Sequence, residues 1–516
     1  MFNQRIYTVS AFLSALFFFS VGAVAQTTYT SITSNNTSAC PASGALPVQC
    51  QKAFTGQNDT RPLVATPQFD RPAGNVSDEN IHSYLNFGSG TKIYANFMLG
   101  YCTTGTGFCN NNVQTGYTAN DSNTVGAQAE DLRRRHIDGA IMTWEGDGTG
   151  EDSATLKFQS YVNSHHCNGP QNCSPMYFIM DDGPDVSYTV TSTGIPGTSG
   201  AACPNTLSGA TYENCVIQHL RNDMCYMNGY HWGNDAYQKA NGRPLVQIFP
   251  DEGVIPATGP APSWADVWVQ MESWNSNLQT NCNRAPYNAN NGVPLIIFEG
   301  SSGFTHTDSS GSYYWVQPAG TDPQSDQFIY NISPASNGAT LDHFYQTAQG
   351  YPSDYTWGGA FKGFNSSGAN WGQNRIMDQD CAQTWLTSLK ESNNYYKSNA
   401  LPYLEIATWN DYNEGTEIES GIDNCYTVGA SVNGSTLNWS LNPTNSSLAS
   451  LTTVSHLEIY DSPDGQNLTL VSSPATASSG TFNLSSLPSG HHTLYVRMVG
   501  RNSILNRISS GVGYTN

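Results

Sequence analysis

Hydrophobic and polar residues alternate along the middle of the chain in two different patterns. Short apolar runs of strand length are separated by longer stretches in which apolar residues recur at helical spacing. The apolar runs are 92–99, 137–144, 176–182, 244–250, 294–300, 355–364 and 403–409, and the helical stretches are 124–135, 151–164, 212–227, 263–277 and 377–395. This alternation predicts repeated β-α units around a parallel sheet.

Seven strand runs are visible, which is one fewer than a closed (β/α)8 barrel of the TIM type requires. We expect the eighth strand within the segment 301–350, near 328–332. The alternative is an open, doubly wound sheet. We favour the barrel because no glycine-rich phosphate loop follows the first strand run.

The pattern changes on both sides of this region. Residues 26–88 are rich in Ser, Thr, Asn and Pro with little periodicity, and we interpret them as an irregular arm stapled by disulfides. After Cys425, short alternating runs broken by turn residues predict an immunoglobulin-like or fibronectin-like β-sandwich over 426–516. The catalytic barrel is then predicted over 89–425, and the sandwich is expected to act as a spacer or stabilising module.

The first 25 residues have the pattern of a signal peptide. Arg5 precedes the apolar run 11–22, and Ala23-Val24-Ala25 forms an A-x-A cleavage site. A membrane anchor is the alternative, but the run is short for a membrane span. We therefore expect a secreted protein, either extracellular or periplasmic.

Composition narrows the range of partners. Charged residues make up 12% of the chain, and the formal net charge is −20. Nucleic acid and anionic membranes both favour a basic face, so neither is expected as a partner. A neutral polysaccharide, bound through hydrogen bonds and aromatic rings, fits this composition. We expect a monomer.

Twelve cysteines in an exported chain predict disulfides. Close spacing favours four local pairs, with the remaining cysteines left for longer links. The local pairs are Cys40/Cys50, Cys102/Cys109, Cys167/Cys173 and Cys203/Cys215, and the remaining residues are Cys225, Cys282, Cys381 and Cys425. Because no C-x-x-C occurs, a zinc knuckle or a thioredoxin-like motif is not expected.

Polar or acidic residues follow nearly every strand run. Active sites of parallel barrels are built at the carboxyl ends of the strands, so we expect these side chains on one rim. The strand ends contribute Asn96, Trp144-Glu145, Asp181, Asp182, Asp251, Glu252, Glu299, Lys362, Asn410, Asp411 and Glu414. Helix capping accounts for some nearby acids, such as Glu151 or Asp152, but not for an acid at almost every strand end.

The last strand run leads into four carboxylates within nine residues, Asp411, Glu414, Glu417 and Glu419, with no Lys or Arg among them. Glycoside hydrolysis uses two carboxyl groups, of which one protonates the leaving oxygen and the other acts as base or nucleophile. Burial and mutual repulsion raise the pKa of one of them and so keep a proton available. Asp411 and Glu414 lie three residues apart in a turn that contains glycine, and they are the candidate pair.

The segment 407–419 resembles the last-strand motif of two secreted glycosidase families. In the fungal α-1,3-glucanases (mutanases, glycoside hydrolase family 71) the motif is similar to W-N-D-[FY]-x-E-S. In the endo-α-mannosidases (family 99) it is similar to F-N-E-W-x-E-G-T-x-I-E. This chain combines the glucanase-like Trp409-Asn410-Asp411 with the mannosidase-like Glu414-Gly415-Thr416 and Ile418-Glu419. The stretches 92–100, 137–144 and 355–372 resemble the first-, second- and sixth-strand regions of these families.

The resemblance implies a glycoside hydrolase that cleaves α-linked polysaccharide of the α-1,3-glucan or α-mannan type without a cofactor. By position, Asp411 would be the base and Glu414 the general acid. The mannosidases work through the sugar's own 2-hydroxyl with retention, whereas the glucanases activate water with inversion, so the stereochemistry stays open. Gly415 stands where the glucanases have Ser, which leaves the substrate open. We expect endo action.

The remaining strand-end residues are candidate substrate-binding groups: Asn96, Trp144, Glu145, Asp181, Asp182, Glu252, Glu299, Trp409, Asn410 and Glu419. Glu419 could bind substrate, orient Glu414 or simply form an ion pair. Glu417 is expected to support the site. Four aromatic residues, Tyr94, Trp144, Trp357 and Trp371, could stack on sugar rings or pack in the core.

Two other functions stay open at this point. The stretch 178–185, FIMDDGPD, is similar to the T-F-D-D-G-P motif of metal-dependent polysaccharide deacetylases, but no two of the 11 histidines have the spacing of the zinc-binding pair. We therefore predict no metal site and interpret Asp182 as a rim acid. The other possibility is a non-catalytic carbohydrate-binding protein on a degenerate barrel.

Overall fold

The structure is a computed structural model of the 516-residue chain. It describes residues 76–99, 122–182, 209–249, 263–282, 292–316, 340–365, 376–377, 379–412, 414–464 and 467–516. The predicted signal peptide (1–25) and most of the predicted arm (26–88) lie outside the described residues. From the end of that arm, the structure describes two short 3-10 helices, η2 (Ile81–Tyr84) and η3 (Gly88–Gly90).

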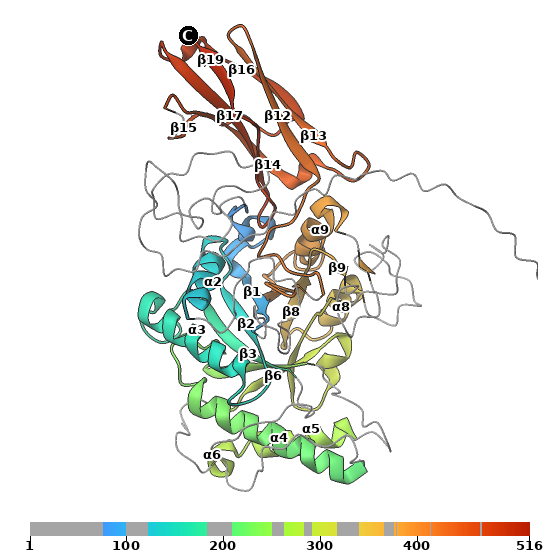
Figure 1. Ribbon diagram of the computed structural model, residues 1–516. Helices are drawn as coiled ribbons and strands as arrows, with labels where there is room; N and C mark the ends of the chain where they lie inside the picture. The colour runs from blue at the N-terminus through green and yellow to red at the C-terminus, as the bar shows by residue number, and fades with distance from the viewer. Residues whose placement is uncertain are drawn as a thin grey trace, which may run out of the picture.

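Eight parallel strands close into a barrel at the centre of the molecule (Figure 1). They are β1 (Lys92–Phe97), β2 (Gly139–Trp144), β3 (Met176–Asp182), β5 (Arg243–Phe249), β6 (Leu295–Glu299), β7 (Ser309–Tyr313), β8 (Tyr355–Ala360) and β11 (Tyr403–Ile406). Each strand pairs with its neighbour in this order, and β11 pairs with β1 to complete the ring. The predicted (β/α)8 barrel is confirmed, and the open doubly wound sheet is wrong.

The eighth strand lies in the predicted segment but not at the expected residues. It is β7, with the sequence Ser-Ser-Gly-Ser-Tyr, whereas the range 328–332 lies outside the described residues. An apolar pattern cannot reveal this strand because small residues are required there. A Cβ on Gly311 would lie 2.0 Å from the carbonyl oxygen of Tyr355, and the hydroxyl of Ser312 donates to the Phe298 carbonyl at 2.8 Å.

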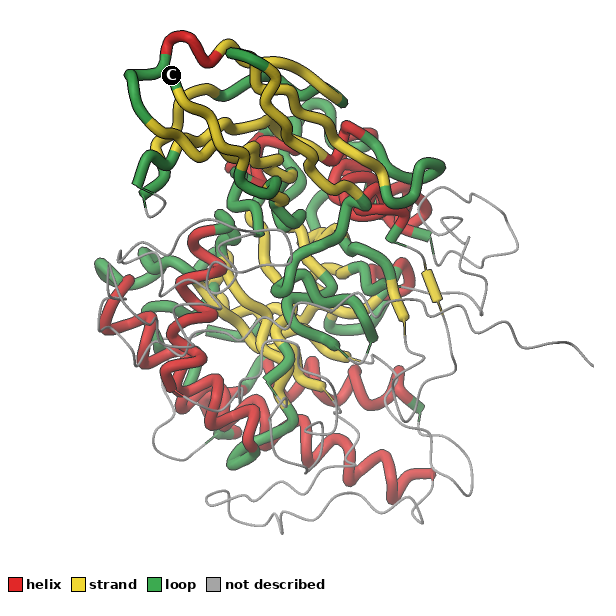
Figure 2. Tube along the Cα trace, turned by 45° about the horizontal axis from the view of Figure 1, so that its top comes forward, coloured by secondary structure: helices red, strands yellow, loops and turns green. Residues whose placement is uncertain are grey.

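Helices surround the barrel (Figure 2). They are α2 (Ser122–Arg134), α3 (Gly150–His166), α4 (Gly209–Tyr230), α5 (Trp264–Asn275), α6 (Leu278–Asn281), α8 (Leu341–Ala348) and α9 (Gln383–Glu391). Five were predicted, although α9 is much shorter than 377–395, and α6 and α8 were not predicted. Short elements also lie here: β4 (Lys239–Ala240), η6 (Ser301–Thr305), β9 (Phe364–Asn365), β10 (Ile376–Met377), η8 (Asp380–Ala382) and η9 (Ser392–Asn394).

Aromatic side chains fill the amino-terminal half of the barrel interior. Tyr94 meets Phe178 and Trp357 edge to face, with ring centroids 5.6 and 5.4 Å apart, and Trp357 stacks on Tyr403 at 4.1 Å. Offset and edge-to-face pairs of this kind are the favoured aromatic contacts. Tyr94 and Trp357 are fully buried here, so they occupy the core positions that were the alternative to sugar stacking. Trp371 lies outside the described residues.

The C-terminal region forms two antiparallel sheets with a hydrophobic core of their own. One sheet contains β12 (Tyr426–Asn433), β13 (Thr436–Pro443) and β16 (Ser479–Asn483). The other contains β14 (Val454–Asp461), β15 (Thr469–Ser472), β17 (His491–Gly500), β18 (Arg507–Ile508) and β19 (Val512–Thr515). Two 3-10 turns, η10 (Leu451–Thr453) and η11 (Leu484–Ser486), connect strands. The antiparallel architecture agrees with the alternating sequence pattern, and the domain boundaries stay a prediction.

Three disulfides staple the described residues: Cys167–Cys173, Cys225–Cys282 and Cys381–Cys425. The first confirms a predicted local pair, and the other two are longer links among the cysteines left over for them. Cys40, Cys50, Cys102, Cys109 and Cys203 lie outside the described residues. Disulfides of this kind are typical of proteins from oxidising compartments.

The barrel and the C-terminal sheets meet at Asn502, which is fully buried. Its side-chain amide donates to the carbonyl oxygen of Arg135 at 3.1 Å, and its own backbone carbonyl accepts from Trp385 Nε1 at 2.9 Å. Isolated β-bridges join Val76 to Leu505 and Ile422 to Ile504 around it. Because these groups are buried, each hydrogen bond is costly to break.

Trp385→Phe is therefore expected to cost more stability than Trp268→Phe. Both indoles are fully buried, but Trp268 Nε1 has no hydrogen-bond partner among the described residues. The loss of ring volume is common to both, so the difference reports the Trp385–Asn502 hydrogen bond, which is worth about 1–2 kcal/mol. Urea unfolding of the two variants measures this difference, and equal costs would show that the bond does not stabilise the junction.

Candidate active site

The segment that follows β11 folds back on itself at the carboxyl end of the barrel. The Thr408 hydroxyl accepts from the backbone N–H of Asp411 at 2.9 Å and contacts the Thr416 hydroxyl at 2.8 Å. The Thr416 N–H donates to the Asp411 carbonyl at 3.1 Å. We call residues 408–419 the acidic turn. Two threonine hydroxyls thus close it without any helix or strand.

Within the acidic turn, Asp411 and Glu414 are held against each other. The backbone N–H of Glu414 donates to Asp411 Oδ1 at 3.0 Å, and the Glu414 carbonyl accepts from the N–H of Asn365 at 2.6 Å. Asp411 is 4% exposed, whereas Glu414 is half-buried. The exposure of Glu414 does not extend to its whole carboxyl group, since its Oε2 atom is buried.

Gly415 allows the turn to pass close to β9. Its φ is +61°, and a Cβ there would lie 3.2 Å from both Cβ and the carbonyl oxygen of Asn365. Glycine adopts a positive φ of this kind without strain. Asn and Asp are less strained there than the other residues. The glycine is therefore required by backbone geometry and by the contact with Asn365.

Gly415→Ala is expected to destabilise the protein by about 1–3 kcal/mol and to lower activity, because it displaces the Glu414–Asn365 contact. Gly434→Ala is the matched control, since Gly434 has a φ of +58° with no atom near its Cβ position. The control shares the backbone strain but not the contact. If both variants lose the same stability and neither loses activity, the contact with Asn365 contributes to neither stability nor catalysis.

Trp409 and Asn410 anchor the acidic turn to β1 and its extension. The Trp409 N–H donates to the Asn96 carbonyl at 2.7 Å. The Asn410 side chain pairs with the backbone of Met98, accepting at 2.8 Å and donating at 2.9 Å. Both side chains are fully buried. Their predicted contact with substrate stays a prediction, while the structure gives each a structural partner.

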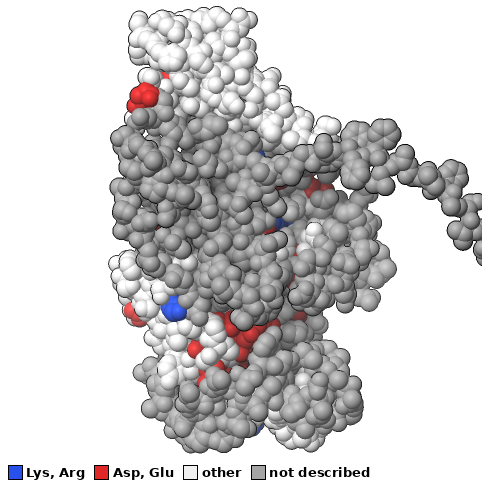
Figure 3. All heavy atoms as spheres, viewed as in Figure 1, with Lys and Arg blue, Asp and Glu red and all other residues white. Residues whose placement is uncertain are grey.

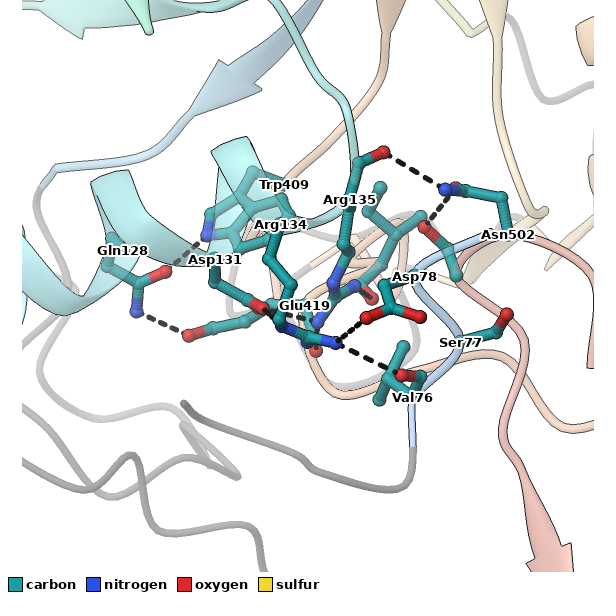
Figure 4. Close-up of polar contacts among 12 residues, drawn as sticks. Val76, Ser77, Asp78, Gln128, Asp131, Arg134, Arg135, Trp409, Glu419 and Asn502 are labelled. Atoms are coloured by element: carbon teal, nitrogen blue, oxygen red, sulfur yellow. Dashed lines mark hydrogen bonds and ion pairs between the residues drawn. The ribbon is translucent and has the colours of Figure 1, made fainter. Parts of the chain in front are cut away.

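Arg135, just after α2, clamps the far end of the acidic turn (Figure 4). Its guanidinium donates to the carbonyl oxygens of Ile418 and Glu419 at 2.7 and 2.6 Å, and to Asp131 Oδ2 at 2.7 Å. The same group lies over the Trp409 ring, 4.7 Å from its centroid. The carboxylate of Asp131 and the two carbonyl oxygens thus compensate the charge of this fully buried arginine.

The two remaining acids of the turn are buried against protein groups. Glu419 accepts from Tyr412 at 2.8 Å and from Gln128, which also accepts from Trp409 Nε1. Glu417 pairs with Lys362, with 2.8 Å between Nζ and Oε1. These contacts agree with a supporting role for both acids. Sequence reasoning could not identify Gln128 or Arg135, since both lie nearly 300 residues away in the chain.

A second group of carboxylates lies near the ends of β2 and β3. Burial, followed by the nearby carboxylates of Asp181 and Asp147, raises the pKa of Asp223 well above its usual range. Burial together with Asp152 raises the pKa of Asp147 to about 6. Figure 3 shows Asp and Glu atoms gathered on one face of the molecule. The sequence predicted Asp181 but not Asp147 or Asp223. Asp223 lies within α4 and not at a strand end, so its position gave no reason to expect it in the site.

Asp152 organises the side chains beside this group. It accepts from Trp144 Nε1 at 3.0 Å and from the Tyr226 hydroxyl at 2.6 Å, and His231 Nε2 lies 3.2 Å away. The Trp144 ring stacks on Tyr226 with centroids 5.9 Å apart. Trp144 is fully buried, and its indole N–H already has a protein acceptor. Its predicted role in sugar stacking stays a prediction.

Glu405 lies inside the barrel and was also missed. Strand β11 stands opposite β5 in the ring, and Gln247 Nε2 donates across the interior to Glu405 Oε2 at 2.7 Å. Burial raises the pKa of Glu405 to about 8, an effect that the bond from Gln247 reduces and the charge of Glu299 increases. Among the described residues no donor contacts Glu405 Oε1, which adds to the cost of a charge there. The group is therefore mostly protonated at neutral pH.

The other predicted site residues fall into three groups. Asn96 is fully buried and accepts from the Thr143 hydroxyl at 3.2 Å. Glu145, Asp182 and Glu299 are half-buried at the ends of their strands, as expected for rim residues. Glu252 and Asp251 lie outside the described residues. Substrate binding by these residues stays a prediction.

Within the described part of the chain, no three His, Cys, Asp or Glu side chains come together as a metal site. Nor does any helix of the described ranges combine the length and apolar character of a membrane span.

Comparison with known proteins finds distant structural likeness. No family model matches the chain, and no curated protein matches it. The GH99 endo-α-mannosidase from Bacteroides thetaiotaomicron in complex with bis-tris propane has a TM-score of 0.41 at 13% identity, covering 63% of this chain and 86% of that chain. A glycoside hydrolase-like protein has a TM-score of 0.40 at 13% identity, covering 64% and 86%. The endo-β-1,4-mannanase from Thermotoga petrophila has a TM-score of 0.22 at 9% identity, covering 85% and 94%. Likeness this distant carries no argument about function.

Proposed function

We propose that this protein is a secreted glycoside hydrolase that cleaves an α-linked polysaccharide of the α-1,3-glucan or α-mannan type. The observation that carries the proposal is the Asp411–Glu414 pair on the acidic turn at the carboxyl end of β11. In parallel barrels this end of the strands is where active sites lie. The hydrogen bond from the Glu414 backbone N–H to Asp411 Oδ1 and the anchors at both ends of the turn keep the pair in place.

Asp411 acts as the base and Glu414 as the general acid. As a whole residue Glu414 is the more exposed of the two, and in this proposal it donates its proton to the leaving oxygen as the glycosidic bond breaks. Asp411, held by its neighbours, removes a proton from either water or the sugar's own hydroxyl. The chemistry needs no metal or other cofactor, and the substrate is a neutral polymer that suits the low charge of the chain.

The rim acids near β2 and β3 extend the site. Half-buried Glu145 and Asp182 offer hydrogen-bond acceptors to sugar hydroxyls, beside the buried Asp223. We propose endo action by a monomer, on a polymer long enough to contact several of these groups.

A substrate panel tests this function. Purified protein is incubated with α-1,3-glucan, α-1,4-glucan, α-1,6-mannan and, as a control, β-1,3-glucan, and newly formed reducing ends are counted with and without a chelator. We expect release from one of the α-linked polymers, unchanged by the chelator. Release of acetate from acetylated glycans that stops in chelator, with no new reducing ends, would instead support a deacetylase. Binding without cleavage across the panel would support a non-catalytic protein.

A further inference from the structure

The outer face of the sheet β12–β13–β16 is free of charge. Outward positions alternate with the buried ones on each strand, and every outward side chain is Ser, Thr, Asn or Gly. They are Thr427, Gly429, Ser431, Asn433, Thr436, Asn438, Ser440, Asn442, Ser479, Thr481 and Asn483. In Figure 3 the C-terminal sheets show few Lys, Arg, Asp or Glu atoms. The face thus lacks both the aromatic residues of a sugar-binding surface and the apolar patch of a protein interface.

Strands β12 and β16 are the two edges of this sheet, because β13 pairs with both. Exposed edges present unpaired backbone groups that can pair with a second molecule, and proteins usually protect them with Lys, Pro, a bulge or a covering segment. The sequences YTVGASVN and SGTFN contain no charged residue and no proline. These edges therefore lack the usual protection in their own sequences.

Each edge strand ends in an acceptor for N-linked glycosylation. Asn433-Gly434-Ser435 ends β12, and Asn483-Leu484-Ser485 ends β16. Asn433 pairs with Thr436, which in turn pairs with Asn483, so the two asparagines lie on one row and one face. Two strand spacings separate them, or about 10 Å. Both residues are exposed.

We propose that Asn433 and Asn483 carry N-linked glycans, which keep the two uncharged edge strands from pairing with a second copy of the chain. The proposal rests on the secretion included in the proposed function. In the transfer, the bond between the sugar C1 and the phosphate of a lipid-linked oligosaccharide diphosphate breaks. A bond from C1 to Asn Nδ2 forms, and the amide loses one proton while the diphosphate leaves.

The same face contains two other asparagines, for which the structure predicts little or no glycosylation. Asn438-Trp439-Ser440 is also an acceptor motif, but Asn438 is half-buried in the central strand and its Nδ2 donates to the Thr436 carbonyl at 3.4 Å. Asn442 is exposed, but Pro443 follows it, and proline blocks the motif. We expect lower occupancy at Asn438 than at the edge positions, and none at Asn442.

Glycopeptide mass spectrometry of the protein secreted by its own cells tests the modification. We expect glycans on Asn433 and Asn483, their loss in Ser435→Ala and Ser485→Ala, and a new glycan on Asn442 in Pro443→Ala, where Thr444 completes the motif. Unmodified Asn433 and Asn483 in secreted, catalytically active protein would overturn this proposal and leave the proposed function intact.

Light scattering tests the role of the glycans. The double variant Asn433→Gln/Asn483→Gln is expected to associate at concentrations at which the wild type stays monomeric, with unchanged activity per folded molecule. Asn445→Gln, which removes an acceptor motif in the loop after β13, is the control and should stay monomeric. A double variant that stays as monomeric as this control would show that the glycans do not protect the edges.

Discussion

Asp411→Asn and Glu414→Gln are each expected to lower the rate of polysaccharide hydrolysis by about 100- to 10,000-fold, the range in which general acid–base catalysis contributes. Both substitutions keep the size of the side chain. In Asp411→Asn the new amide oxygen can still accept from the backbone N–H of Glu414, and the bond from Asn365 to the Glu414 carbonyl is made by backbone atoms. The fold should therefore survive while the proton chemistry is lost.

Asp266→Asn is the matched control, because Asp266 is an exposed acid in the first turn of α5, away from the acidic turn. Initial rates of reducing-end release are compared with urea unfolding curves for the three variants and the wild type. If either variant of the acidic turn keeps wild-type activity at wild-type stability, the assignment of the catalytic pair is wrong.

Glu405→Gln is expected to stabilise the protein at about pH 8 far more than at about pH 5. The pKa of Glu405 is raised from 4.5 to about 8 in the folded state, so between these values the folded protein holds a proton that the unfolded chain releases. The free energy of unfolding therefore falls as the pH rises through this window, by at most about 5 kcal/mol through this group. Glutamine has nearly the same shape and carries no such proton, so it removes the dependence.

Urea unfolding of the wild type and Glu405→Gln at several values between about pH 5 and pH 8 measures this difference. Asp308→Asn is the control, since burial raises the pKa of Asp308 only to about 6. Its benefit should level off above that value, whereas the benefit of Glu405→Gln should continue to grow. A constant difference between Glu405→Gln and the wild type across the range would show that Glu405 is not held protonated.

The sequence predicted the barrel because most of its strands are buried on both sides and therefore appear as continuous apolar runs. Strand β7 departs from this rule, since Gly311 must approach the backbone of Tyr355 and Ser312 must reach the Phe298 carbonyl. Small polar residues meet those needs, and no hydrophobic pattern marks them. Strand β7 can be identified only from its pairing with β6 and β8 in the structure.

The candidate site was predicted where the chemistry is local in sequence. Asp411 and Glu414 are three residues apart at a strand end, so spacing and the family resemblance were enough to name them. Asp223 lies within a helix and Glu405 within a strand, and the pKa of each is raised mainly by burial in the folded protein, with a smaller contribution from nearby carboxylates. Arg135 clamps the acidic turn although it lies 283 residues before Ile418 in the chain. Such roles depend on tertiary contacts that a single sequence does not display.

The central claim is that Glu414 donates the proton and Asp411 acts as the base. It is tested most directly by the rates of the two variants on an aryl α-glycoside whose phenol leaves without protonation. Glu414→Gln should hydrolyse this substrate at nearly the wild-type rate while failing on the polysaccharide, since the proton is no longer needed. Asp411→Asn should fail on both. Equal loss on both substrates for Glu414→Gln, or a full rate for Asp411→Asn on either, would contradict the account.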